Sequence, residues 1–162
     1  MFRNDLSAIY GNGNTPLIIA VILNQENNVR DLLVTDVNAT NKDNNTALIM
    51  AAAYGRTTIA QLLLTASNIN VNAANVDGYT ALSKAAQCGH QDIVELLLNF
   101  KGIDLTIRNY SHYTAADEAR IRGLKDIADL IDLAAEQQRA LIAKAEDDQQ
   151  FFFDTAVDCR IC

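Results

Sequence analysis

The stretch that decides the fold is DGYTALSKAAQCGHQDIVELLL, residues 77–98. Two apolar segments within it show the i, i+3, i+4 spacing of amphipathic helices. Thr80 can cap the first helix through its hydroxyl, and Gly89 can end it with a left-handed backbone. We therefore predict two short helices joined by a tight turn. Their apolar positions are Leu82, Ala85 and Ala86, followed by Ile93, Leu96 and Leu97.

The same pattern recurs along the chain with a fixed period. Thr46, Thr80 and Thr114 stand 34 residues apart, and glycines and asparagines keep the same spacing. An earlier copy begins at Thr15, where Pro16 occupies the first helical position, which needs no backbone N–H. A fixed period of this length is the signature of a repeat architecture. The residues in phase are Asn41, Asn75 and Asn109, and Gly55, Gly89 and Gly123.

These motifs resemble the ankyrin repeat, a helix, tight turn, helix and β-turn in about 33 residues. The resemblance rests on Thr15-Pro16-Leu17, Thr46-Ala47-Leu48, Thr80-Ala81-Leu82 and residues 89–98. It implies an all-α solenoid of about four repeats. The fourth copy departs from the pattern at 114–117, where Asp117 follows two alanines. We interpret this more polar copy as the C-terminal cap of the stack.

The last predicted helix is longer than a repeat requires. After Gly123, apolar residues keep a helical phase to about Glu146, and we predict that this long helix caps the stack. The predicted organisation is an N-terminal cover at 1–12, repeats at 13–134 (13–43, 44–77, 78–111 and 112–134), a helical extension at 135–150 and a tail at 151–162.

Composition limits the classes of function. The net charge is −7, and the 13 Lys and Arg residues are scattered, whereas nucleic-acid binding needs clustered cations. Three cysteines are too few and too badly placed for a disulfide framework. The chain shows neither an apolar run long enough to span a membrane nor an apolar leader. We expect a monomeric cytoplasmic protein that binds no nucleic acid and no cofactor.

The resemblance also implies where a protein partner binds. In ankyrin stacks, side chains on the hairpins and first helices make the contacts, and four of the five tyrosines fall at these positions. Tyrosine is enriched at binding hot spots. The alternative is that the tyrosines only pack along the hairpins and stiffen the stack. The candidate partner-binding residues are Lys42, Asn45, Tyr54, Val76, Tyr79, Cys88, Arg108, Tyr110, Tyr113, Ile121 and Arg122.

Catalytic patterns are missing from the sequence. His90 falls in the turn between two helices, and His112 has no acidic or thiol partner nearby in sequence. Nothing resembles a catalytic triad, a phosphate-binding loop or a metal-ligand set. Cys88 is interpreted as a small apolar residue. A non-enzymatic adaptor or inhibitor is therefore the leading hypothesis, and an enzyme ranks third.

The C-terminal sequence Cys159-Arg160-Ile161-Cys162 allows three interpretations. It fits a redox pair, half a zinc site or a prenylation box, and its terminal position favours the last. Cys159 is then the lipidation candidate, against the alternative of an inert tail. One lipid gives only weak membrane association. A small ankyrin protein ending this way resembles effectors that bacteria inject into host cells, which implies the second hypothesis: a prenylated effector in the host cytosol or at the membrane periphery.

Overall fold

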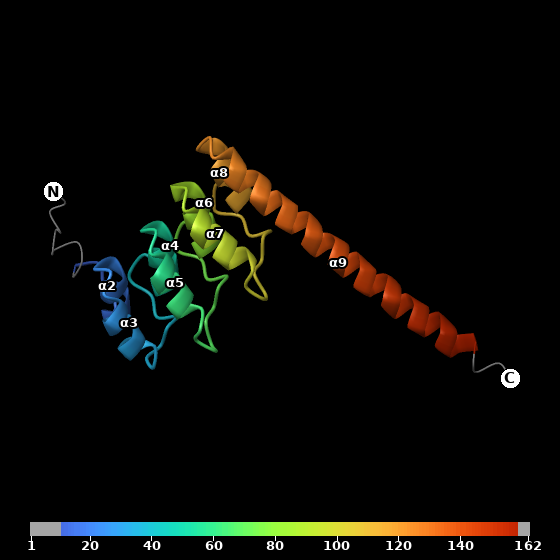
Figure 1. The fold of residues 1–162 in the computed structure, drawn as a ribbon, viewed down its shortest axis with the longest axis horizontal. Helices are drawn as coiled ribbons and strands as arrows, with labels where there is room; N and C mark the ends of the chain where they lie inside the picture. The colour runs from blue at the N-terminus through green and yellow to red at the C-terminus, as the bar shows by residue number, and fades with distance from the viewer. Residues whose placement is uncertain (1–10, 159–162) are drawn as a thin grey trace. The chain divides into compact units, whose positions relative to one another are not determined.

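The computed structural model describes residues 11–158, with side chains described to residue 145. Within that range the chain is all helical, without strands, and the helices follow one another in four pairs (Figure 1). The predicted all-α repeat solenoid is confirmed. The pairs are α2 (Pro16–Ile22) with α3 (Glu26–Leu32), α4 (Ala47–Ala53) with α5 (Thr57–Leu63), α6 (Ala81–Cys88) with α7 (Gln91–Leu98), and α8 (Ala115–Ile121) with α9 (Lys125–Asp158).

The pairs stack because the first helix of each pair packs on the first helix of the next, and the second helices pack on one another in the same way. The first helices form one row, in which α2 contacts α4, α4 contacts α6, and α6 contacts α8. The second helices form another row of α3, α5 and α7. Alanines at the helix–helix contacts permit a close approach, and larger aliphatic side chains fill the core between the rows. Fully buried examples are Ala51, Ala52, Ala85, Ala86, Ile59, Leu63, Ile93 and Leu97.

Each first helix begins at the threonine that the sequence predicts as its cap. The hydroxyl of Thr46 accepts a hydrogen bond from the backbone N–H of Ile49, and Thr15 caps α2 in the same way. Thr80 and Thr114 form full capping boxes, in which the side chain three residues on bonds back to the threonine N–H. These bonds satisfy donors that a helix start otherwise leaves unpaired.

The repeated asparagines build the hairpins. The side-chain oxygen of Asn75 accepts hydrogen bonds from the backbone N–H groups of Asp77 and Tyr79, and Asn41 and Asn109 do the same in their own repeats. All three asparagines are buried. Consecutive hairpins are also joined through the backbone, since Val76 N donates to Asp43 O at 3.0 Å and Tyr110 N to Asp77 O at 3.0 Å. The hairpins therefore lie in register along one side of the stack.

The chain divides into two compact units within α9, one ending at Ile131 and the next beginning at Asp132. In the first unit, α9 contributes the buried Ile127, Ala128 and Ile131 to the core. The helix continues to Asp158, later than the predicted end at residue 150, because no Gly or Pro follows Gly123. None of the helices among the described residues combines the length and apolar character needed to cross a membrane.

Candidate partner-binding surface

A groove of about 560 Å³ lies between the second and third repeats. The C-terminal half of α4 supplies its apolar wall, and the two hairpins supply polar groups at its edge. This volume is within the range of known ligand pockets, and the groove is open to solvent. The residues that line it are Asp43, Asn45, Ile49, Met50, Ala53, Tyr54, Asn75, Val76, Asp77 and Lys84.

Tyr54 is the central residue of this region. It is the C-terminal cap of α4, and 49% of its surface is exposed. It also lines a neighbouring hollow of about 200 Å³ between the first and second repeats, together with Asp43, Asn45 and Met50. The structure thus brings together three of the residues predicted from sequence, Asn45, Tyr54 and Val76.

Tyr79 has a different role from the other predicted tyrosines. It is half-buried, and its hydroxyl donates to Glu118 Oε1 at 3.1 Å and accepts from Gln87 Nε2 at 3.2 Å. The Lys84 ammonium lies 3.9 Å from the centre of the Tyr79 ring. Burial, and next the hydrogen bond to Glu118, raise the pKa of the Tyr79 hydroxyl above 10.0. Tyr79 therefore links the third repeat to the fourth, which agrees with the stiffening alternative for this residue.

A protein-family model described as ankyrin repeats (3 copies) matches residues 17–109 and 63–140, which together include most of the chain. The chain belongs to the ankyrin-repeat family. Members of this family generally serve as protein–protein interaction modules and are typically non-enzymatic. No curated protein matches the sequence.

The remaining predicted residues do not line the groove, and all of them except Lys42 lie in the third and fourth ankyrin repeats. Tyr110, Tyr113 and Ile121 are exposed, with Tyr110 the most exposed at 77%. Arg108 donates to the backbone oxygen of His112 at 2.7 Å and lies 3.7 Å from the Asp117 carboxylate. Lys42 donates to the Gly11 oxygen, and Cys88 and Arg122 are exposed.

Met50 and Lys84 also line the groove and are not among the candidate residues predicted from the sequence. Each stands four residues after a capping threonine, at the same place in its ankyrin repeat. Residues i and i+4 lie on the same face of a helix. Alignment of the repeats on their capping threonines would therefore have predicted both residues. Asp43 and Asp77 occupy the hairpin positions next to the predicted residues and also line the groove.

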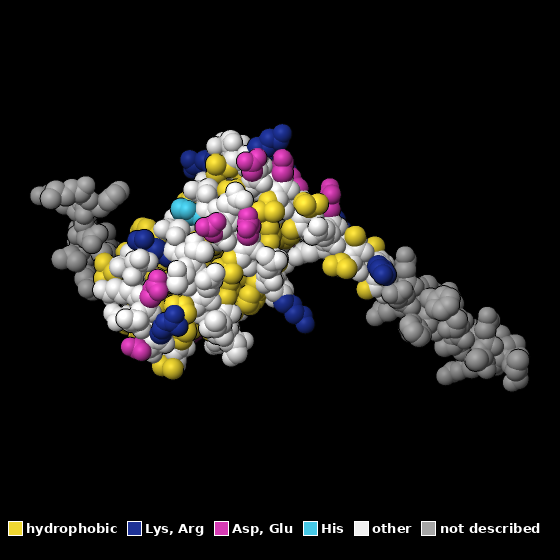
Figure 2. Space-filling view, in the orientation of Figure 1, with side chains coloured by type: hydrophobic (Ala, Val, Ile, Leu, Met, Phe, Trp, Pro, Cys, Tyr) yellow, Lys and Arg dark blue, Asp and Glu magenta, His cyan; other side chains and the backbone are white. Residues whose placement is uncertain are grey.

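Figure 2 shows Lys and Arg scattered over the face in view, without a continuous basic patch there.

Among the side chains that the structure describes, no group of three or more His, Cys, Asp and Glu is placed to hold a metal ion. His90 lies against the Ala53 oxygen, with Nε2 at 3.3 Å. Cys159, the lipidation candidate, lies outside the described residues.

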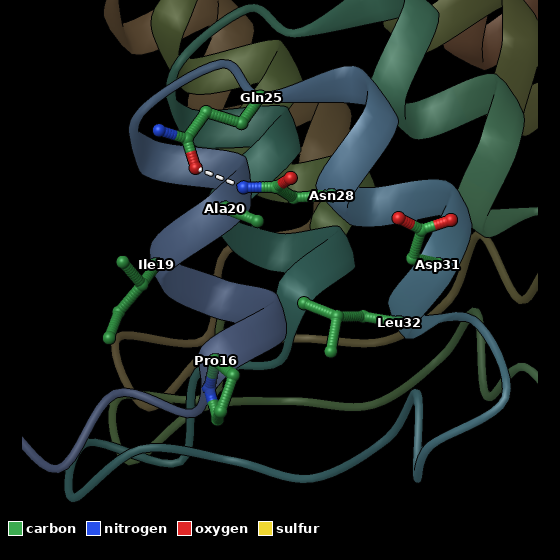
Figure 3. A pocket seen from close by; sticks show the side chains of 7 residues that line it. All are labelled: Pro16, Ile19, Ala20, Gln25, Asn28, Asp31 and Leu32. Atoms are coloured by element: carbon green, nitrogen blue, oxygen red, sulfur yellow. Dashed lines mark hydrogen bonds between the residues drawn. The ribbon is translucent and has the colours of Figure 1, made fainter.

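A second hollow, of about 430 Å³, opens on the first ankyrin repeat between α2 and α3. Figure 3 shows Pro16, Ile19 and Ala20 on one helix and Leu32 on the other, with Asn28 donating to Gln25 at 2.7 Å. Apart from the Asp31 carboxylate, the lining of this hollow consists of apolar side chains and amides. The N-terminal cover predicted at 1–12 falls largely on residues 1–10, which are outside the described range.

Proposed function

We propose that this ankyrin stack is a non-enzymatic adaptor or inhibitor that holds a protein partner on its hairpin and first-helix surface, centred on the Tyr54 groove. The observation that carries the proposal is the half-exposed ring of Tyr54, which borders two adjoining hollows beside Met50. An aromatic ring in this position offers a large rigid contact area at low entropic cost. The exposed Val76 extends the same apolar wall.

Further apolar groups continue the surface toward the C-terminal end of the stack. Tyr110, Tyr113 and Ile121 are exposed on the hairpin and first helix of the fourth repeat. Exposed apolar side chains that gather on one face mark interaction sites more often than ones scattered singly. We therefore assign these three residues to the outer part of the partner contact, and Tyr79 to the support beneath it.

The experiment is capture of partner proteins by the full chain and by matched variants. Tyr54→Ala and Val76→Ser remove groove residues, whereas Val34→Ser removes an apolar side chain that is 90% exposed elsewhere. A photo-reactive amino acid placed at position 54 or 34 then reports contact directly. We expect the groove variants to lose the partner and position 54 to crosslink, while Val34→Ser behaves like the parent. Equal capture by all variants, with circular dichroism showing intact helices, would contradict the proposal.

The prenylated effector stays a prediction, as do the cytoplasmic location and the monomeric state. Mass spectrometry of the protein recovered from eukaryotic cytosol tests prenylation, because an unmodified Cys159 followed by intact residues 160–162 rejects it. Light scattering on the purified chain tests the monomer.

A further inference from the structure

The hairpin edge of the Tyr54 groove carries two carboxylates that form no ion pair with a described side chain. Asp43 and Asp77 occupy equivalent positions on consecutive hairpins, and both line the groove and are exposed. The carboxylate of Asp117 pairs with Arg108 and Arg120, whereas no ion pair joins Asp43 or Asp77 to a side chain that the structure describes. The Asp43 carboxylate accepts a hydrogen bond from Asn12 Nδ2 at 2.6 Å, which leaves it acceptor capacity.

The one lysine of the groove is held away from these carboxylates. The Lys84 ammonium lies over the Tyr79 ring and donates to Gln87 Oε1 at 3.2 Å. Both contacts hold its charge beside side chains of its own repeat, and neither is to a hairpin carboxylate. The edge formed by Asp43 and Asp77 therefore presents negative charge to a partner.

Part of the lining of the same groove is apolar. Met50, Ala53 and Val76 line it beside the half-exposed Tyr54 ring. A side chain that fits this combination has an aliphatic stem and a cationic, planar end. Arginine has both, since its stem covers apolar surface and its guanidinium stacks on aromatic faces and bonds carboxylates in a forked geometry. Lysine offers a point charge that matches the planar ring less well.

We propose that the Tyr54 groove accepts an arginine side chain of the protein partner, with its stem against Met50 and its guanidinium between the Tyr54 ring and the carboxylates of Asp43 and Asp77. This inference rests on the proposed function and adds the chemistry of the partner. The net charge of −7 is consistent with a basic partner segment, because the field of the whole protein then attracts it. Charge-assisted hydrogen bonds and stacking would fix its orientation.

The test uses random dodecapeptides displayed on phage and selected on the full chain. Selected peptides are synthesised, and their affinities are measured for the parent, for Tyr54→Ala, and for the double variant Asp43→Asn/Asp77→Asn. Asp92→Asn/Asp129→Asn is the matched control, because it removes the same charge from exposed positions outside the groove. Each peptide arginine is also replaced by lysine and by norleucine.

We expect arginine to be enriched in peptides whose binding requires Tyr54. Their affinity should fall about tenfold or more in Asp43→Asn/Asp77→Asn, which loses charge-assisted bonds, and by less than about twofold in the control pair. Replacing the arginine by norleucine should cause a similar loss, and lysine a smaller one. The exposed positions of both aspartates favour folding of the asparagine variants, and circular dichroism verifies it.

Two other outcomes separate the inference from the function on which it rests. Peptides that require Tyr54 but lack arginine, or that bind the asparagine variant as well as the parent, overturn the arginine site and leave the binding function standing. Peptides that bind Tyr54→Ala as well as they bind the parent count against both the arginine site and the binding function. A selection that yields no binding peptide also counts against both.

Discussion

The carboxylate of Glu118 on α8 accepts a hydrogen bond from the Tyr79 hydroxyl of the preceding repeat, at 3.1 Å. The same oxygen accepts from Asn109 Nδ2 at 2.6 Å, and the other oxygen from Gln87 Nε2 at 3.0 Å. Glu118 is only 4% exposed, so these three donors replace the water that a carboxylate otherwise requires. They join the third and fourth repeats beneath the proposed binding surface.

The origin of this network is a change at one hairpin position. In earlier repeats the buried asparagine donates to an asparagine of the preceding hairpin, as Asn75 does to Asn45 at 3.0 Å. The position equivalent to Asn45 in the third repeat is Tyr79. Asn109 donates to Glu118 instead, and Tyr79 donates to the same carboxylate. A buried carboxylate thus takes the place of the amide acceptor.

The first prediction concerns the coupling of these two residues. Tyr79→Phe removes one donor and Glu118→Gln removes the charge that all three donors share, so each should lower the free energy of unfolding by about 1–2 kcal/mol. The double variant should lose less than the sum, with a coupling of at least about 0.5 kcal/mol, because both changes remove the same bond. Urea unfolding at pH 7 measures the free energy of unfolding of the parent, the two single variants and the double variant. Strictly additive losses would show that the bond contributes nothing to stability.

The second prediction follows from the raised pKa of the Tyr79 hydroxyl. The unfolded chain releases this proton near pH 10.0, while the folded chain still holds it, so the folded state binds more protons in that window. Stability contributed by Tyr79 is therefore fully present below pH 10 and lost as pH rises toward the folded pKa. The difference in unfolding free energy between parent and Tyr79→Phe should narrow above pH 10. A constant difference between pH 7 and pH 11 would contradict it.

The third prediction compares two equivalent asparagines. Asn75→Asp keeps the acceptor for two backbone N–H groups and loses only the donor to Asn45. Asn109→Asp keeps the same acceptor but places a second carboxylate where an amide now lies 2.6 Å from Glu118. Like charges at this distance repel strongly in a buried site. At pH 7, Asn109→Asp should therefore lower the thermal midpoint more than Asn75→Asp does. In a Glu118→Gln background, this difference between the two variants should be smaller. Equal midpoints would contradict the proposed environment of Glu118.

The structural features that recur in every repeat can be predicted from the sequence. The caps at Thr46 and Thr80, the hairpin asparagines and the left-handed glycines each solve a backbone problem that is identical in every repeat, so their spacing reveals them. The resemblance to ankyrin repeats predicts Tyr54 as a partner-binding residue from its place in the repeat, and its side chain is 49% exposed.

The rest depends on differences between repeats, which a period does not record. Tyr79 occupies an expected binding position, yet Glu118 draws its hydroxyl into a hydrogen-bond network. The hydrogen bond of Tyr79 depends on a side chain 39 residues away, and no residue near Tyr79 in the sequence predicts it. The predicted helical extension ends at residue 150, whereas α9 continues to Asp158 through a segment that contains neither Gly nor Pro.

The fourth prediction concerns Gly55, which has a φ of +65° and faces the ring of His90. A Cβ added there would lie 2.7 Å from the ring carbon Cε1, so Gly55→Ala combines backbone strain with a steric clash. We expect a loss of about 2 kcal/mol or more in unfolding free energy. In a His90→Ala background the clash is removed and only the backbone cost remains, so Gly55→Ala should cost less there. The same loss in both backgrounds would show that the ring moves aside freely.

The fifth prediction concerns the two units that meet within α9. A chain ending after Ala135 keeps the buried Ile127 and Ile131, whereas a chain ending after Leu124 loses both. Removal of two buried isoleucines should cost about 4 kcal/mol or more, because each leaves apolar core surface uncovered. The longer chain should keep most of the unfolding free energy and lose mainly helical ellipticity, since Leu133 and Leu141 are exposed in the parent. Chemical denaturation followed by far-ultraviolet circular dichroism separates the two effects. A large loss of stability in the longer chain would mean that residues beyond 135 take part in the core.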